Sequence, residues 1–196
     1  MTSSPNISLI LLAAGLSQRF GDANKLLADI DGDTVVAKSA AAFNTPDFSQ
    51  RFAVVADKPV ADALNDRWTI VQNNAPETGM ANSLRLGLEA AGDCDWVVVA
   101  LGDMPNILPD TVDLLFGAAA GEGSNTALPI APMMLTTNSA PRPGHPVFWP
   151  RHLIPDLLEI EGDKGGKALL GKGFQPVICD DTGIYFDIDT PEDLTR

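Results

Sequence analysis

The stretch LAAGLSQRFGDANK, residues 12–25, decides the fold. It follows the run ISLILL, residues 7–12, which is short and almost continuously apolar, as expected of a strand buried on both faces of a parallel sheet. Gly15 lets the chain turn after that strand, and the small Ala13 and Ala14 let a ligand approach the main chain. Successive backbone N–H groups in such a turn favour phosphate. The stretch therefore predicts a phosphate-binding turn that includes the main chain of Leu12.

Two cations stand in the same stretch. Arg19 offers a planar fork to phosphate oxygens and Lys25 a compact point charge, and a triphosphate in a dry turn needs both. The alternative is an ordinary strand-to-helix connection with two solvated cations. Two other phosphate loops are excluded, because Lys25 does not stand in a Gly-Lys-Ser/Thr sequence and no GxGxxG pattern lies between Gly15 and Gly21.

Composition indicates one globular domain over residues 1–196, with 45% hydrophobic and 20% charged residues. The formal charge of −13 argues against nucleic acid as a partner but not against a nucleotide, which needs only local positive potential. No apolar run is long enough to cross a membrane and residues 7–12 lack the features of a signal peptide, so we expect a cytoplasmic protein. Cys94 and Cys179 are far apart and predict reduced, structural thiols.

Strand and helix signals alternate along the chain, which favours a parallel or mostly parallel α/β fold. We expect strands at residues 52–56, 69–71 and 96–101 besides the first. Helices are expected from Thr34 to about residue 43, near residues 61–64, over residues 80–91 and from Pro109. The stretch from Ala131 to Pro143 reads as a long irregular segment over the substrate side.

Three aspartates are candidate site residues. Asp103 follows the buried run WVVVALG at the carboxyl edge of the sheet, where open α/β folds bind ligands. Asp187 and Asp189 alternate around Ile188, so on a strand they share a face and can aim at one cation. The alternatives are that Asp103 caps the following turn and that Asp189 caps a helix begun by Pro191.

Six segments, in order along the chain, resemble the nucleotidyltransferases similar to MobA and MocA, the molybdenum cofactor guanylyl- and cytidylyltransferases. The first is residues 12–25, which departs from the family signature at Phe20, where Met is usual. The others are GMANSLRLGL (79–88), LGDMP (101–105), GHPVF (144–148), GDKGGKALL (162–170) and DIDTPEDL (187–194). GHPVF and the GDKGGKALL pattern place the chain closest to the cytidylyltransferase branch, as does Ala14, where guanylyl enzymes tend to have Gly.

The resemblance implies a single-domain, three-layer α/β/α fold with a Rossmann-like, mostly parallel sheet of the nucleotide-diphospho-sugar transferase type. It implies that Asp103 and Asp189 bind Mg²⁺, with Asp187 binding directly or through water. Gly79, Met80 and Ser83 would contact base and ribose, although a plain surface turn is a comparable interpretation of Ser83. For the acceptor the family motifs indicate His145, Asp163 and Lys167; a structural His and a solvated charged turn are the alternatives.

The implied reaction is in-line attack by a phosphate oxygen of a molybdopterin-type acceptor on the α-phosphorus of CTP, with release of pyrophosphate. Positioning and charge neutralisation by Arg19, Lys25 and Asp103 would supply the catalysis. A guanylyltransferase, acting on molybdopterin or a small phosphorylated metabolite, is one alternative. The other is a nucleotide- or cofactor-binding module without turnover that docks on a molybdoenzyme or its chaperone. Acceptor identity, the choice between CTP and GTP and oligomeric state stay open at this point.

Overall fold

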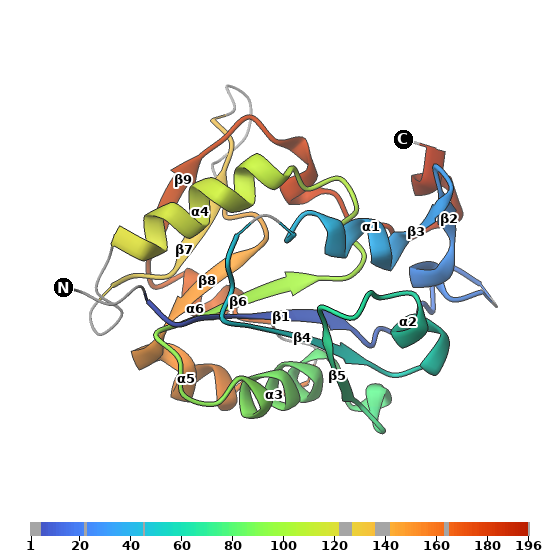
Figure 1. The fold of residues 1–196 in the computed structure, drawn as a ribbon, viewed down its shortest axis with the longest axis horizontal. Helices are drawn as coiled ribbons and strands as arrows, with labels where there is room; N and C mark the ends of the chain where they lie inside the picture. The colour runs from blue at the N-terminus through green and yellow to red at the C-terminus, as the bar shows by residue number, and fades with distance from the viewer. Residues whose placement is uncertain are drawn as a thin grey trace.

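One seven-stranded sheet runs through the protein (Figure 1). The structure is a computed structural model that describes residues 5–21, 23–44, 46–121, 127–135, 142–162 and 165–195. In spatial order the strands are β5 (Thr69–Gln72), β4 (Gln50–Val55), β1 (Ile7–Ala13), β6 (Trp96–Leu101), β8 (Val147–Pro150), β7 (Ile130–Met133) and β9 (Gln175–Ile178). Only β8 among these strands runs against the others, so the expected mostly parallel sheet is confirmed.

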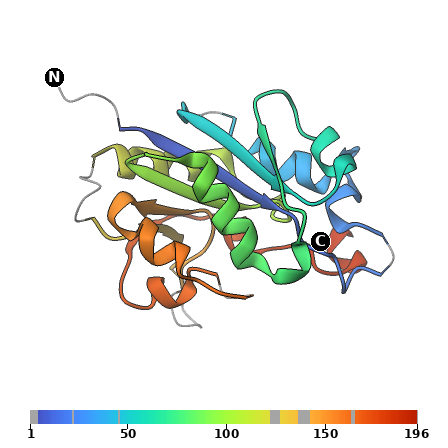
Figure 2. The same cartoon turned by 90° about the horizontal axis from the view of Figure 1, so that it is seen from below.

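Helices cover both faces of this sheet. In Figure 1, α1 (Val35–Ala41) and α4 (Pro109–Gly121) lie on one side, and α3 (Met80–Ala91) and α5 (Ile154–Leu158) lie on the other, which Figure 2 shows from below. The side chains of the central strand β1 alternate between the two faces of the sheet. They therefore contribute to the hydrophobic core on each side. Leu9 and Leu11 pack on the side of α1 and α4, whereas Ile10 and Leu12 pack on the side of α3. The expected three-layer arrangement is therefore present.

The remaining elements are short and lie mostly at the edges of the sheet. They are α2 (Lys58–Asp62), α6 (Lys167–Leu170), the small hairpin of β2 (Asp29–Ile30) and β3 (Asp33–Thr34), and the 3₁₀ turns η1 (Lys25–Leu27), η2 (Pro76–Thr78), η3 (Arg151–Leu153), η4 (Thr182–Tyr185) and η5 (Pro191–Thr195). Among the described residues, no helix has the length and apolar character needed to span a membrane.

Local signals placed several elements well. The helix α3 and the strand β6 coincide with the expected ranges, and Thr34 caps α1 by accepting a hydrogen bond from the N–H of Ala37. The helix expected near residues 61–64 begins three residues earlier, at Lys58, because Pro59 at its second position favours a helix start. The helix begun at Thr34 ends at Ala41, two residues before the expected end.

Two expectations were wrong. Asp187 and Asp189 do not lie on a strand: they follow η4 in a segment without ladder partners, tied to the sheet by the bond from the N–H of Ile188 to the carbonyl of Asp103, 2.8 Å. The segment from Ala131 to Pro143 is not irregular throughout, because β7 occupies its first residues. Pro132 concealed this strand, since proline lacks an N–H and argues against a strand interior. Residues 136–141 of this segment lie outside the described residues.

Candidate active site

The turn after β1 is closed by short polar side chains. Ser17 adopts a left-handed conformation, with φ 52°, and its carbonyl accepts from the N–H of Phe20 at 2.8 Å. The Ser17 hydroxyl also accepts from the N–H of Lys25 at 3.1 Å, and the Asn24 side chain accepts from the N–H of Leu26 at 3.0 Å. These bonds fold the segment back on itself, so that Lys25 begins η1 directly beside the end of β1.

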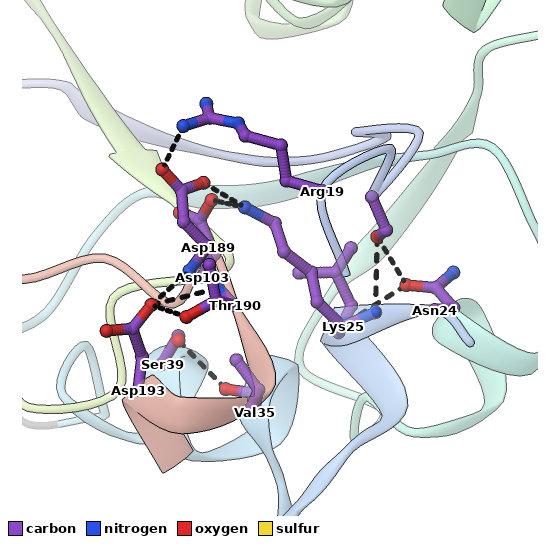
Figure 3. A network of polar contacts seen from close by, with 11 residues as sticks. Arg19, Asn24, Lys25, Val35, Ser39, Asp103, Asp189, Thr190 and Asp193 are labelled. Atoms are coloured by element: carbon purple, nitrogen blue, oxygen red, sulfur yellow. Dashed lines mark hydrogen bonds and ion pairs between the residues drawn. The ribbon is translucent and has the colours of Figure 1, made fainter. Parts of the chain in front are cut away.

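Lys25 lies between two carboxylates that come from distant parts of the chain (Figure 3). Its Nζ is 2.7 Å from Oδ2 of Asp103, at the end of β6, and 3.3 Å from Oδ1 of Asp189, near the C-terminal end of the chain. Arg19 completes the cluster, with Nη1 2.8 Å from Oδ2 of Asp189. Lys25 is largely buried, with 11% of its side chain exposed, whereas the Arg19 side chain is 76% exposed. The Arg19 side chain therefore has room to move toward a ligand if its ion pair with Asp189 opens.

Two groups in and beside this cluster, Lys25 and Asp187, have shifted pKa values. Burial lowers the pKa of Lys25, but the neighbouring Asp103 and Asp189 outweigh burial, and the net effect raises the pKa. Lys25 is therefore a cation at physiological pH. The pKa of Asp187 is raised, first by burial and then by the negative charges of Asp103 and Asp189. A cation bound beside Asp187 would oppose this rise in its pKa and favour the ionised carboxylate.

Close packing holds Asp103 at the end of the first strand. The N–H of the preceding Gly102 donates to the carbonyl of Leu12 at 2.9 Å, and a Cβ at Gly102 would lie 2.9 Å from Cβ of Ala13. Only glycine permits this approach without displacing β1. The absence of a side chain at Gly102 therefore lets Asp103 lie against the turn that follows β1.

A cavity of about 430 Å³ opens at this edge of the sheet. All the residues predicted to bind nucleotide line it, and so do the three predicted metal ligands. They are Leu12, Ala13, Ala14, Gly15, Arg19, Lys25, Gly79, Met80 and Ser83, together with Asp103, Asp187 and Asp189. Turn, cations, carboxylates and the start of α3 thus face one space.

A second cavity, of about 420 Å³, adjoins the first and shares Leu12, Met80, Leu101 and Asp187 with it. The predicted acceptor residues His145 and Lys167 line it, and Asp163 lies outside the described residues. Its other walls are mainly apolar, from Leu84, Val99, Met104, Val147, Trp149, Leu157, Leu170 and Ile184. Two neighbouring cavities could accommodate two substrates, with Asp187 between them.

Both the backbone and the ring of His145 make contacts within the protein, and its ring bonds to the backbone of Val99. Its backbone N–H donates to the carbonyl of Ile184 at 3.0 Å, and the peptide to Pro146 is cis. Burial lowers the pKa of this imidazole, so the ring is neutral at physiological pH, and its buried Nδ1 has no hydrogen-bond partner in the described part of the chain. Because Nδ1 is buried, a ligand in the second cavity can bond to this nitrogen only if the ring turns toward the cavity.

The donor chemistry of the first cavity fits a hard cation. The Oδ1 atom of Asp103 is buried without a hydrogen-bond partner among the described residues, and Mg²⁺ prefers carboxylate oxygen. In the present arrangement the described residues contain no group of three or more His, Cys, Asp or Glu side chains close enough to hold a metal ion. The Lys25 ammonium neutralises Asp103 and Asp189 instead.

Several polar residues of the site were missed by sequence reasoning. Asp193 accepts hydrogen bonds from the N–H groups of Asp189, 3.2 Å, and Thr190, 2.9 Å (Figure 3), so Asp193 rather than Asp189 makes the cap at η5. The alternative capping role for Asp189 was therefore wrong, because the Asp189 carboxylate points to Lys25 and Arg19 instead. The spacing of Asp193 three residues after Thr190 is a capping-box pattern that could have indicated this.

A third, polar cavity of about 370 Å³ was also missed. It adjoins the turn, and Asn24, Asp57, Gln72 and Asn73 line it. Asp57 follows β4 and Asn73 follows β5, at the same carboxyl edge of the sheet as Asp103. The polar run QNN at residues 72–74, directly after a strand, was the available signal.

Comparison with known proteins agrees with this geometry. Residues 9–177 match the model of the MobA-like NTP transferase domain. Nicotine blue oxidoreductase of Paenarthrobacter nicotinovorans is 29% identical over 100% of this chain and 98% of its own length. Molybdenum cofactor guanylyltransferase of Cupriavidus pinatubonensis is 26% identical over 99% of this chain and 97% of its own length. The crystal structure of Rv0371c from Mycobacterium tuberculosis has the same fold, with a TM-score of 0.82 and 23% sequence identity. The match covers 99% of this chain and 98% of Rv0371c. The resemblance found in the sequence motifs is confirmed, and the chain belongs to the MobA-like NTP transferase family of nucleotidyltransferases.

Proposed function

We propose that the protein transfers CMP from CTP to the phosphate of a molybdopterin-type cofactor, in the presence of Mg²⁺, and releases pyrophosphate. The observation that carries this proposal is the single cavity in which the turn after β1, Arg19, Lys25 and Asp103 meet. A phosphate-binding turn and two cations suit a triphosphate, and the adjoining carboxylates suit its metal ion. The relative named molybdenum cofactor guanylyltransferase supports the class of acceptor.

The reaction is a displacement at phosphorus. A phosphate oxygen of the acceptor forms a bond to the α-phosphorus, the bond from the α-phosphorus to the bridging oxygen breaks, and pyrophosphate leaves with that oxygen. Asp103 and Asp189, with Asp187 directly or through water, would hold Mg²⁺, which supplies charge neutralisation at the phosphates. Arg19 and Lys25 stabilise the negative charge that grows on the leaving pyrophosphate. The contacts of Lys25 with Asp103 and Asp189, which hold its ammonium at the cavity, support this role.

The acceptor enters through the second cavity. Its apolar walls suit a ring system, and the exposed Lys167 at the start of α6 can pair with an acidic group at the rim. The neutral His145 forms a hydrogen bond to the acceptor there and does not act as a cation. This assignment places the acceptor beside Asp187, where the two cavities meet.

Guanylyl transfer is a second candidate. It is favoured by the relative of that name, which matches 99% of this chain. Cytidylyl transfer is favoured by Ala14, whose methyl group lines the first cavity where guanylyl enzymes tend to have glycine. Both candidates use the same cations and carboxylates, so they differ in the base alone.

The test is to incubate the protein with molybdopterin, Mg²⁺ and CTP, GTP or ATP, and to measure both pyrophosphate and the dinucleotide product by mass spectrometry. We expect product with CTP, and none with the Asp103→Ala variant. Product with GTP alone would make the protein a guanylyltransferase. Tight nucleotide binding without product from any nucleotide would instead identify a binding module without turnover.

A further inference from the structure

Asn73 lies at the end of β5, beside the nucleotide cavity, and is almost fully buried, with 1% exposed. Its amide bonds to Ser83, on the first turns of α3, whose side chain lines that cavity. We propose that Asn73 is a positioning residue that fixes the direction of the Ser83 hydroxyl, so that Ser83 donates a hydrogen bond to an acceptor atom of the bound nucleoside. This inference rests on the proposed function, because it requires a nucleotide in the cavity.

The direction of the Asn73 amide follows from its donors. Oδ1 of Asn73 accepts from the backbone N–H of Ala75 at 2.9 Å. A backbone N–H can only donate, so the oxygen of the amide must face it. The nitrogen of the Asn73 amide is thereby directed to the other side, toward Ser83.

A second chain of bonds fixes the same direction independently. The Arg85 guanidinium, which has no acceptor, donates from Nη2 to Oδ1 of Asn82 at 2.7 Å. Nδ2 of Asn82 must then face inward, and it donates to Oδ1 of Asn73 at 2.9 Å. Two groups that can only donate, a peptide N–H and a guanidinium, therefore set the two amides in one orientation.

The orientation of the Asn73 amide determines where the Ser83 hydroxyl can donate its hydrogen. Nδ2 of Asn73 donates to the Ser83 Oγ at 2.9 Å, so the hydroxyl is the acceptor in that bond. Ser83 is buried, with 5% of the residue exposed. Within the described ranges, its hydroxyl makes no other hydrogen bond. A hydroxyl carries one hydrogen. The Ser83 hydrogen is therefore left for the cavity, where it suits a carbonyl, ring nitrogen or hydroxyl oxygen and opposes an N–H group of a ligand.

The direct experiment is to reverse the direction of the hydrogen bond between Asn73 and Ser83. In Asn73→Asp the carboxylate still accepts from Ala75 and Asn82, but it also accepts the Ser83 hydrogen, so Ser83 presents only lone pairs to the ligand. We expect CTP affinity, measured by calorimetry with Mg²⁺, to fall about tenfold, the effect of one hydrogen bond. Ser83→Ala is expected to show the same loss. The combined variant should show no further loss, because both changes remove one interaction.

Two controls separate this effect from charge and folding. Asn65→Asp adds the same charge at an exposed residue that lines none of the three cavities and has no bond to Ser83, and it should bind CTP within about twofold of wild type. Tripolyphosphate has no nucleoside, so it should bind Asn73→Asp and wild type alike. If Asn73→Asp does not fold, Asn73→Ala in the same cycle with Ser83→Ala serves, again with losses that do not add.

The inference is overturned if Asn73→Asp binds CTP as wild type does, if tripolyphosphate binding falls in parallel, or if the losses of Asn73→Asp and Ser83→Ala add. Failure of the wild-type protein to bind any nucleoside triphosphate would overturn the proposed function first, and this inference with it. Binding of CTP by wild type without sensitivity to Asn73 would overturn only the inference.

Discussion

The ammonium nitrogen of Lys25 lies 2.7 Å from Oδ2 of Asp103, which joins the turn after β1 to the end of β6. The two residues are 78 positions apart in sequence, and they meet because β1 and β6 are parallel neighbours whose carboxyl ends share one edge of the sheet. The cation proposed to bind phosphate and the carboxylate proposed to bind the metal ion are thereby held side by side. This relationship defines the reacting centre of the proposed enzyme.

Replacement of Lys25 should remove activity without unfolding the protein. Asp103 and Asp189 are partly exposed, with side chains 20% and 29% accessible, so water can solvate them when the ammonium is absent. We expect Lys25→Ala to lower kcat by about a hundredfold or more, the usual effect of removing one charge contact to a transition state. Lys58→Ala, which removes an exposed lysine paired with Asp62, is the matched control and should keep wild-type kcat. Retained turnover in Lys25→Ala would remove Lys25 from its assigned role.

Asp103 should govern the dependence on magnesium. An amide is a weaker ligand for Mg²⁺ than a carboxylate, and the unpartnered Oδ1 of Asp103 is the oxygen best placed to bind it. In Asp103→Asn we expect turnover to fall at least about a hundredfold and to saturate at higher Mg²⁺. Initial rates over a magnesium titration give both quantities. Asp62→Asn is the control, and a wild-type titration curve for Asp103→Asn would contradict the assignment.

Two glycines near the turn should respond differently to alanine. A Cβ at Gly102 would lie 2.9 Å from Cβ of Ala13 and 3.2 Å from the carbonyl oxygen of Leu12, so Gly102→Ala should destabilise the fold by about 1–3 kcal/mol. A Cβ at Gly15 would meet nothing within 4 Å, but it would project from the lining of the nucleotide cavity. We therefore expect Gly15→Ala to have the same free energy of unfolding as wild type and to bind nucleotide more weakly. Urea unfolding with nucleotide titration separates the two, and equal stability of both variants would contradict the packing argument.

The two cysteines should be poorly reactive in the folded protein. Burial raises the pKa of the Cys94 and Cys179 thiols above the usual value of about 8.5, so at a given pH a smaller fraction is thiolate. Iodoacetamide labelling should therefore be slow at pH 7 and should accelerate as pH rises past that value. Cys94 is fully buried and Cys179 partly exposed, so Cys179 should react first and Cys94 only after unfolding. Rapid labelling of Cys94 at pH 7 in the folded protein would contradict this.

The parts of the fold that sequence predicted are those with strong local signals. The apolar runs of β1 and β6 and the spacing of Leu84 and Leu88 on α3 identify their elements, because burial fixes the period of the pattern. The strands β7, β8 and β9 were not found, since each contains a proline and has only four residues. Their pairing depends on partners far away in the chain.

The residues of the candidate site likewise fall into those that the sequence indicated and those that it did not. Motifs indicated Arg19, Lys25 and Asp103 as candidates, and the structure brings the three side chains to one cavity. Asn73 and Ser17 were missed, since a single amide or hydroxyl acts here through the direction of its hydrogen bonds. That direction depends on partners such as Ala75 and Asn82, which only the folded chain brings together.

The central claim is that the cavity lined by the turn, Arg19, Lys25 and Asp103 binds a nucleoside triphosphate. The most direct measurement is calorimetric titration of the protein with CTP, GTP and ATP in the presence of Mg²⁺, repeated with Lys25→Ala. We expect Mg²⁺-dependent binding, tightest for CTP, that Lys25→Ala weakens at least about tenfold. Binding that is unchanged in Lys25→Ala, or the absence of binding by all three nucleotides, would contradict the claim.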